Sequence, residues 1–302
     1  MNWVTKTSNQ SGAGVPPAEL RGRDVRATLF TVFLFLFICT SLHASQLPLP
    51  DPNAAFVIVS VQSGKILSEE NLQILQKQYP PGSLIKVFTT IAFYEQYGDH
   101  FPVFQCPPSL ASDPAGCWER HGHGEVHIAD ALAHSCNVYF RQLAEKISPE
   151  TFQKTLQKFQ LTKNLDGLQE QEIRKIMTGT TLNWTVSPLK LLQAYCSIFN
   201  ATVPLNGTLR TILQRGLSES SEKGTSLEAR KASGHALLGK TGTSLLWEDG
   251  KINWRSTQGW WIGLYPARNP EIAVLTFVPN GRGATHAAPL GGKVIAWYLQ
   301  SR

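Results

Sequence analysis

The pattern of hydrophobic and polar positions predicts strands at both ends of residues 45–302. The first strand, residues 54–61, is apolar and β-branched, and a Gln-Ser-Gly-Lys turn joins it to a short second strand. Three more strands are predicted near the C-terminus, at residues 235–247, 257–266 and 271–279, with turn sequences between them. Because the connections are short, we expect about five strands with mostly antiparallel pairing.

Segments with helical spacing lie between these strands, and one more closes the chain. They are residues 84–97, 128–147, 148–159, 187–199 and 288–300. Strands at both ends around a helical block predict an α+β domain, in which the two termini build one sheet and helices pack on it. A cleft between the sheet and the helical block is the natural place for a functional site.

The chain of 302 residues has 42% hydrophobic and 17% charged residues, so it can bury a sizeable core. Near the N-terminus, three arginines precede an apolar run at residues 27–42, and small residues follow around Ala44. This order is typical of an export signal, and the length of the run also fits a membrane anchor. We therefore expect a polar, basic stub at 1–26, a signal peptide or anchor at 27–44 and one domain at 45–302. The domain would lie in the periplasm or on the outer face of the cytoplasmic membrane.

The net charge of +6 gives little support to nucleic acid as a partner. Removing residues 1–44 takes away four basic and two acidic groups, which leaves 24 basic and 20 acidic groups and a net charge of +4. This excess is small and scattered along the chain, so we expect no nucleic acid partner.

Four cysteines lie outside the export segment. In an oxidising compartment Cys106 and Cys117 could form a disulfide, and two free thiols are an equally good interpretation. A possible zinc site is suggested by six residues that are close in sequence: Cys106, Cys117, His121, His123, His127 and Cys136. Their spacing matches no standard structural zinc site, so we expect no metal and no cofactor.

The segment YPPGSLIKVF, residues 79–88, predicts an exposed serine at the start of a helix. Two prolines and a glycine before Ser83 end any helix on that side, and helical spacing follows it. Lys86 lies three residues later on the same helix face. A lysine amine can remove a serine proton only when it is neutral, which requires burial or a neighbouring cation.

Spacing alone does not identify this pair, because the same pattern occurs at Ser187/Lys190 and at Ser220/Lys223. Two further motifs distinguish Ser83. HSCNVYF supplies Ser135 and Asn137 within a helical pattern, and GKTGTS supplies Lys240, Thr241, Gly242 and Thr243 on a predicted strand.

The set S-x-x-K, S-x-N and K-T-G in this order resembles the signature of penicillin-binding proteins and class A β-lactamases. YPPGSLIK, TVSPLKLLQAY, GKTGTS and WWIGLYPARNPEIAV are similar to blocks in the transpeptidase domains of class B penicillin-binding proteins, and the resemblance covers most of residues 54–300. It implies a β-lactamase/transpeptidase-like fold, with a five-stranded antiparallel sheet, an all-helical subdomain and the active serine at their junction.

The resemblance also implies the chemistry of a serine D,D-transpeptidase. Ser83 would attack a D-Ala-D-Ala stem peptide of peptidoglycan, or a β-lactam antibiotic, and form an acyl-enzyme. Lys86 would be the base, Ser135 would pass the proton to the leaving amine, and Asn137 would donate its amide to the substrate backbone.

The K-T-G motif would bind the substrate and assist the base. Lys240 would add positive charge near Ser135 and keep Lys86 neutral, and the hydroxyls of Thr241 and Thr243 would hold the substrate carboxylate. Gly242 would let the strand edge approach the substrate. The backbone N–H groups of Ser83 and Thr243 would form the oxyanion hole.

Several related functions stay open at this point. The chain resembles a bare transpeptidase domain, and its size would also suit a D,D-carboxypeptidase, a β-lactamase, or a β-lactam sensor or non-catalytic scaffold. Class A β-lactamases carry a glutamate shortly before a Leu-Asn pair, whereas here Gly179 lies four residues before Asn183. The expected partners are stem peptides and β-lactams, with the membrane or cell-wall synthesis proteins as further candidates. Trp260 and Trp261 could flank the cleft, but core packing is the better interpretation for an apolar strand.

Overall fold

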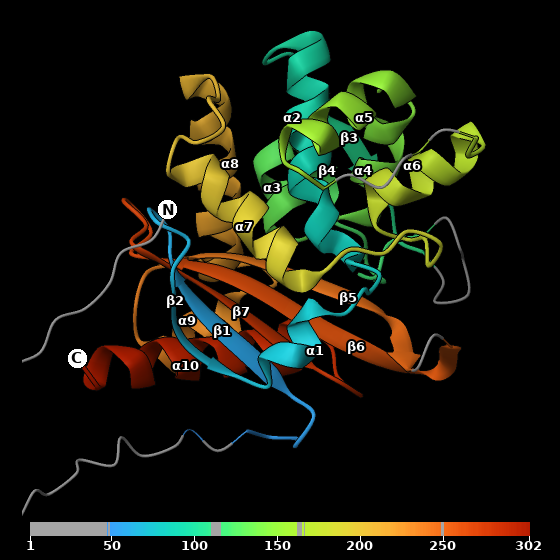
Figure 1. Ribbon diagram of the computed structural model, residues 1–302. Helices are drawn as coiled ribbons and strands as arrows, with labels where there is room; N and C mark the ends of the chain where they lie inside the picture. Colours follow the sequence, from blue (N-terminus) through green and yellow to red (C-terminus); the bar gives the residue numbers. More distant parts are fainter. Residues whose placement is uncertain (1–46, 48, 110–115, 162–164, 166, 249–250) are drawn as a thin grey trace, which may run out of the picture. The chain divides into compact units, whose positions relative to one another are not determined.

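Five antiparallel strands form one sheet in the order β2–β1–β7–β6–β5 (Figure 1). Their bounds are β1 Ala55–Ser60, β2 Ile66–Glu70, β5 Leu238–Glu248, β6 Lys251–Tyr265 and β7 Ile272–Val278. β1 pairs with β7 along its whole length, so the two ends of the domain meet in the middle of the sheet. This confirms the predicted fold class, and β5 is left as an edge strand.

The computed structural model describes residues 47, 49–109, 116–161, 165, 167–248 and 251–302. Residues 44–302 cluster as one unit. The predicted export segment, residues 27–44, lies outside the described residues. In the part of the chain that is described, no helix is long and apolar enough to cross a membrane.

Side chains that alternate along the strands supply two hydrophobic cores, one on each face of the sheet. In β1, Val57 packs into the core under the helical block, whereas Ile58 packs into the core on the opposite face. Likewise, Trp260 packs into the core under the helical block and Trp261 into the core on the opposite face, and both are almost completely buried. The prediction that these two tryptophans pack in the core is therefore confirmed.

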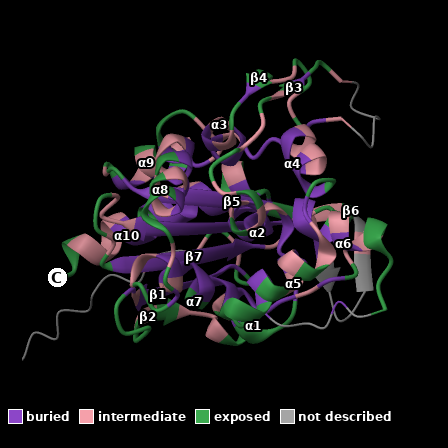
Figure 2. Ribbon diagram, turned by 90° about the horizontal axis from the view of Figure 1, so that it is seen from above, coloured by how far each residue is buried: buried purple, intermediate pink, exposed green. Residues whose placement is uncertain are grey.

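Helices cover both faces of the sheet (Figure 1). On one face lies the block α2 Lys86–Tyr97, α3 Ile128–Ala133, α4 Asn137–Ala144, α5 Pro149–Lys158, α6 Glu170–Thr178, α7 Pro188–Phe199 and α8 Gly207–Glu222. On the other face lie α9 Leu227–Ser233 and α10 Ala288–Gln300. Smaller elements are α1 Leu72–Gln76, the 3₁₀ turn η1 Gly82–Ile85, the hairpin β3 Phe104–Cys106 and β4 Gly124–Val126, and the π-turn η2 Gly283–Ala287. Figure 2 shows that the strands between these layers are mostly buried.

The single helix predicted over residues 128–147 is wrong, because the chain breaks there into α3 and α4. Ser135 has a φ of +53°, in the left-handed region that interrupts a helix. Cys136 then caps α4, and its Sγ accepts a hydrogen bond from the backbone N–H of Tyr139 at 3.4 Å. Each of the two helices buries apolar residues, so the hydrophobic spacing continues through the break and periodicity alone could not reveal it.

Candidate active site

Ser83 lies in the turn η1, which leads directly into α2. The sequence predicts a helix start, and the structure refines this to a 3₁₀ turn in which residues three apart eclipse each other. Gly82 has a φ of +55°, and a Cβ at this position would lie 2.6 Å from the carbonyl oxygen of Thr243. A glycine is therefore required where the serine turn lies against β5.

Two contacts from the helical block hold this turn in place. The hydroxyl of Tyr195, on α7, donates a hydrogen bond to the carbonyl oxygen of Leu84 at 2.7 Å. Gly179, which ends α6 with a φ of +73°, lies so close that a Cβ there would overlap the carbonyl oxygen of Gly82. At Gly179 the serine turn therefore meets backbone, with no acidic side chain.

Lys86 is fully buried at the first turn of α2. Its ammonium donates hydrogen bonds to the backbone oxygen of Ser135 at 2.8 Å and to Oδ1 of Asn137 at 2.7 Å, with Oγ of Ser135 at 3.5 Å. Burial lowers the pKa of Lys86 from 10.5 to about 8, although the thiols of Cys136 and Cys117 oppose this shift. Some neutral amine is thus present near neutral pH, as a general base requires.

Lys240 is also fully buried, and its Nζ donates to Oγ of Ser135 at 2.8 Å. Burial holds the pKa of Lys240 well below its usual value, and the positive charge of Lys86 lowers it further. The Ser135 hydroxyl therefore lies between two lysine amines, where it can pass a proton. Burial is the main cause of the low pKa of Lys86, and the repulsion between the two lysines acts on the pKa of Lys240.

The break between α3 and α4 positions the second motif. The left-handed conformation of Ser135 turns both its hydroxyl and its carbonyl oxygen toward Lys86. Asn137 starts α4 and accepts from Lys86 through Oδ1, which leaves its amide N–H₂ group available as a donor. The side chains of Ser135 and Asn137 both line the same cleft as Ser83.

The remaining residues of the third motif follow along the edge strand β5. The hydroxyl of Thr241 donates to that of Thr225 at 2.7 Å, and the hydroxyl of Thr243 accepts from the backbone N–H of Gly283 at 3.0 Å. A Cβ at Gly242 would lie 2.8 Å from the carbonyl oxygen of Pro81. On this side Gly242 lets the serine turn approach β5, whereas the sequence predicts that it lets the strand edge approach the substrate.

The predicted oxyanion-hole amides belong to segments in direct backbone contact. A Cβ on Gly82 would lie 3.0 Å from the backbone nitrogen of Thr243, so the turn that carries Ser83 adjoins the amide of Thr243. Among the described residues, neither the amide nor the hydroxyl of Ser83 forms a hydrogen bond. Both groups are thus free to meet a substrate carbonyl.

A cleft of about 380 Å³ joins these side chains. Its described lining contains predicted and unpredicted residues: Ser83, Trp118, Ser135, Asn137, Thr225, Thr241, Thr243, Thr257, Arg282, Ala284 and Thr285. Sequence reasoning missed Trp118, Thr225, Thr257, Arg282 and Thr285, since none of them belongs to a motif. The exposed Arg282 adds a cation beside the two threonines, and no carboxylate is present among the described residues of the lining.

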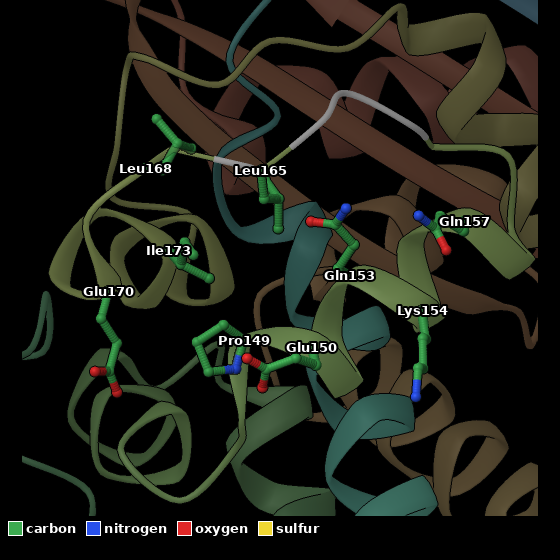
Figure 3. Close-up of a pocket in the computed structure, with 9 residues that line it drawn as sticks. All are labelled: Pro149, Glu150, Gln153, Lys154, Gln157, Leu165, Leu168, Glu170 and Ile173. Carbon is green, nitrogen blue, oxygen red and sulfur yellow. The ribbon is translucent and has the colours of Figure 1, made fainter.

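A second hollow, of about 500 Å³, lies between α5 and α6 (Figure 3). Its lining includes Glu150, Gln153, Lys154, Glu170 and Ile173, and Figure 3 shows these side chains around the space between the two helices. It is the larger of the two, but it contains none of the motif residues and no nucleophile. The smaller cleft is therefore the candidate active site.

The other two serine–lysine pairs are structural. Ser187 caps α7, and its buried hydroxyl donates to the carbonyl oxygen of Leu75 at 3.0 Å. Lys190 is exposed. The hydroxyl of Ser220 donates to another serine hydroxyl, and Lys223 forms ion pairs with acidic side chains. Only Ser83 among the three serines lines the candidate cleft together with residues of the other two motifs.

The model of the penicillin binding protein transpeptidase domain family matches residues 54–296. The chain belongs to this family. A curated relative, the peptidoglycan D,D-transpeptidase MrdA of Acinetobacter baumannii, is 24% identical over 298 residues, which cover 76% of this chain and 43% of the relative. The chain thus spans less than half the length of this relative.

Solved structures of penicillin-binding proteins have the same fold. The transpeptidase domain of penicillin-binding protein 3 from Burkholderia pseudomallei superposes with a TM-score of 0.69 at 19% identity, over 82% of this chain and 88% of that one. Penicillin-binding protein 2 from Helicobacter pylori, solved in complex with MreC, gives a TM-score of 0.66 at 19% identity, over 82% of this chain and 59% of that one.

The cysteines do not form the disulfide considered from the sequence, since Cys106, Cys117, Cys136 and Cys196 are all free thiols. Instead, the first three surround His123, with all four ligand atoms within 4.8 Å of one another. The sequence interpretation set a metal aside because the spacing was unusual. The fold brings four of its six candidates together and leaves His121 and His127 exposed outside the cluster.

Proposed function

We propose that the chain is a serine D,D-transpeptidase that acts on D-Ala-D-Ala stem peptides in peptidoglycan synthesis and is inhibited by β-lactams. The observation that carries this proposal is that one site brings together five residues of the three motifs: Ser83, Lys86, Ser135, Asn137 and Lys240. The buried lysine amines lie on either side of the Ser135 hydroxyl, and Ser83 opens into the same cleft.

The proposed reaction begins when Oγ of Ser83 attacks the carbonyl carbon of the penultimate D-alanine. Neutral Lys86 takes the Oγ proton, and the oxyanion is stabilised by the backbone N–H groups of Ser83 and Thr243. The bond to the terminal D-alanine then breaks, and its amine nitrogen receives a proton through the Ser135 hydroxyl. The acyl-enzyme is resolved when an acceptor amine attacks its ester carbonyl and Ser83 regains its proton.

Substrate binding would use the open edge of β5. An extended peptide can add to an exposed strand edge through main-chain hydrogen bonds. Its terminal carboxylate would be held by the hydroxyls of Thr241 and Thr243 and by the cation of Arg282, because all three residues line the same cleft as Ser83.

Rapid hydrolysis, which defines a β-lactamase, has less support from the site. Hydrolysis of an acyl-enzyme needs a base for the incoming water, and a class A enzyme uses a glutamate for it. The described cleft lining contains no carboxylate, and Gly179 presents only backbone to the serine turn. A long-lived adduct with β-lactams is therefore expected.

The test measures D-alanine release from a synthetic stem peptide, with and without an acceptor amine. We expect release in the wild-type protein, a cross-linked product when the amine is present, and no release in Ser83→Ala. Ser187→Ala, which changes another serine of the same motif, serves as the matched control and should keep the activity. Release without any cross-linked product would identify a carboxypeptidase, and the absence of release from a protein that β-lactams acylate would identify a sensor.

For location and partners, we propose an exported protein that works at the outer face of the cytoplasmic membrane or in the periplasm, because its substrate would be found there. The apolar run at residues 27–42 and the basic residues before it support this. The complex of the Helicobacter pylori relative with MreC suggests a cell-wall synthesis protein as a partner.

A further inference from the structure

Three cysteines and one histidine meet at the point where the β3–β4 hairpin reaches the second motif. Cys106 ends β3, Cys117 lies in the loop that follows, His123 precedes β4, and Cys136 caps α4. Nδ1 of His123 lies 3.5 Å from Sγ of Cys106 and 3.6 Å from Sγ of Cys117. Sγ of Cys117 lies 3.9 Å from Sγ of Cys136.

These separations match the edges of a tetrahedral zinc site. With Zn–S bonds of about 2.3 Å and a Zn–N bond of about 2.05 Å, tetrahedral angles place ligand sulfurs about 3.8 Å apart and sulfur and nitrogen about 3.6 Å apart. The three separations given above agree with these values, and the remaining ones are at most 4.8 Å. Three thiolates with one imidazole are a standard ligand set for structural zinc.

The backbone around the cluster brings these ligands together. Gly122 has a φ of +71°, and a Cβ there would overlap the carbonyl oxygen of Cys106. The next amide, that of His123, donates to the same carbonyl oxygen at 3.1 Å. The backbone N–H of Tyr139 donates to Sγ of Cys136, as amides commonly do to metal-bound thiolates.

Ordinary packing and disulfide bonding account for the arrangement less well. One imidazole nitrogen faces two sulfurs at hydrogen-bond distance, although it can make only one good hydrogen bond in its own plane. A disulfide would pair two of three cysteines and leave the third beside it as a buried thiol. A shared central ion satisfies all four groups at once.

We propose that Cys106, Cys117, His123 and Cys136 form a binding site for one zinc ion. The ion would join the β3–β4 hairpin to the second catalytic motif, since Cys136 lies between the two residues that contact Lys86. It would also fix the cleft wall next to Cys117. There Trp118 lines the cleft, and its indole N–H donates to the carbonyl oxygen of His134 at 2.9 Å.

The first experiment measures metal content in the purified protein under reducing conditions, by elemental mass spectrometry. We expect about one zinc ion per chain, retained through gel filtration. The protein freed of zinc with a chelator is then titrated with Co²⁺, because thiolate-bound tetrahedral Co²⁺ gives intense charge-transfer and visible absorption. X-ray absorption at the zinc edge should show three sulfur ligands and one nitrogen ligand.

The chain offers matched controls for each ligand type. Cys136→Ser and His123→Asn should lose most of the zinc and the cobalt absorption, whereas Cys196→Ser and His121→Asn should retain both. Cys196 is buried outside the cluster, and His121 lies two residues from His123 but is exposed. If a variant fails to fold, metal analysis and cobalt titration of the wild-type protein still test the zinc site directly.

Less than about a tenth of a zinc ion per chain, together with cobalt spectra that lack thiolate bands, would overturn the proposal. A disulfide between two of the three clustered cysteines, mapped in freshly purified wild-type protein, would overturn it as well. All of these readouts are independent of catalysis. A chain that binds zinc but does not acylate Ser83 would refute the proposed function alone, and the reverse result would refute the zinc site alone.

Discussion

Acylation of Ser83 should depend on pH through the deprotonation of Lys86. Burial lowers the pKa of this lysine to about 8, so a change in pH of one unit near neutrality changes the amount of neutral amine strongly. The neutral fraction is about 1% at pH 6, about 9% at pH 7 and about 90% at pH 9. If neutral Lys86 is the base, the acylation rate should rise by about tenfold from pH 6 to pH 7 and level off above pH 8.

The assay measures the second-order rate constant for acylation by a fluorescent penicillin, in buffers from about pH 6 to about pH 9 at constant ionic strength. The stability of the penicillin is measured separately in each buffer. Lys86→Met removes the base and should lower the rate by about 100-fold to 10,000-fold, with no remaining inflection near pH 8. Lys190→Met changes the exposed lysine of a second serine–lysine pair, and it should reproduce the wild-type profile.

A profile that is flat from pH 6 to pH 9 would refute the role of neutral Lys86, as would a rate that falls as pH rises. The direction of this pH dependence follows from the chemistry of the Lys86 amine, which is cationic when protonated and basic when neutral. The amine is active when deprotonated, so activity is lost as pH falls below the pKa of Lys86 in the folded protein.

Three further substitutions test the surrounding contacts. Lys240→Met should lower the acylation rate by about 100-fold, because the Ser135 hydroxyl loses its buried amine partner, and the penicillin assay measures this. Gly179→Ala should lower the free energy of unfolding by about 1–3 kcal/mol, since it adds a Cβ at positive φ against the carbonyl oxygen of Gly82; an unchanged midpoint in urea would contradict this. Tyr195→Phe should cost about 1–3 kcal/mol in the same urea experiment, because it leaves the carbonyl oxygen of Leu84 without its buried partner.

The sheet and the three motifs were predictable because their signals are local. Apolar, β-branched runs separated by turn residues gave the strands, and the predicted terminal helix has the same bounds, residues 288–300, as α10. The two prolines and the glycine before Ser83 correctly indicated where a helix could begin. Motif order then indicated which of three serine–lysine pairs belongs to a site.

The parts that could not be predicted depend on contacts between distant segments. The break at Ser135 lies within a continuous hydrophobic pattern, and with a φ of +53° its carbonyl oxygen accepts a hydrogen bond from Lys86, which lies 49 residues away along the chain. The sequence predicts that Gly242 lets the strand edge approach the substrate, whereas in the structure the serine turn lies against Gly242. The sulfur cluster forms because the short β3–β4 hairpin carries Cys106 and His123 to the cap of α4, and the spacing along the chain suggests six candidates without showing which four meet.

If Ser83 is the nucleophile, a penicillin acyl group should be found on it, and locating that group on the chain tests this directly. The protein is incubated with penicillin, digested and mapped by tandem mass spectrometry. We expect one penicilloyl group per chain, on the peptide that contains YPPGSLIK, with the added mass on Ser83 and none on Ser83→Ala. An adduct on any other residue, or equal labelling of Ser83→Ala, would contradict it.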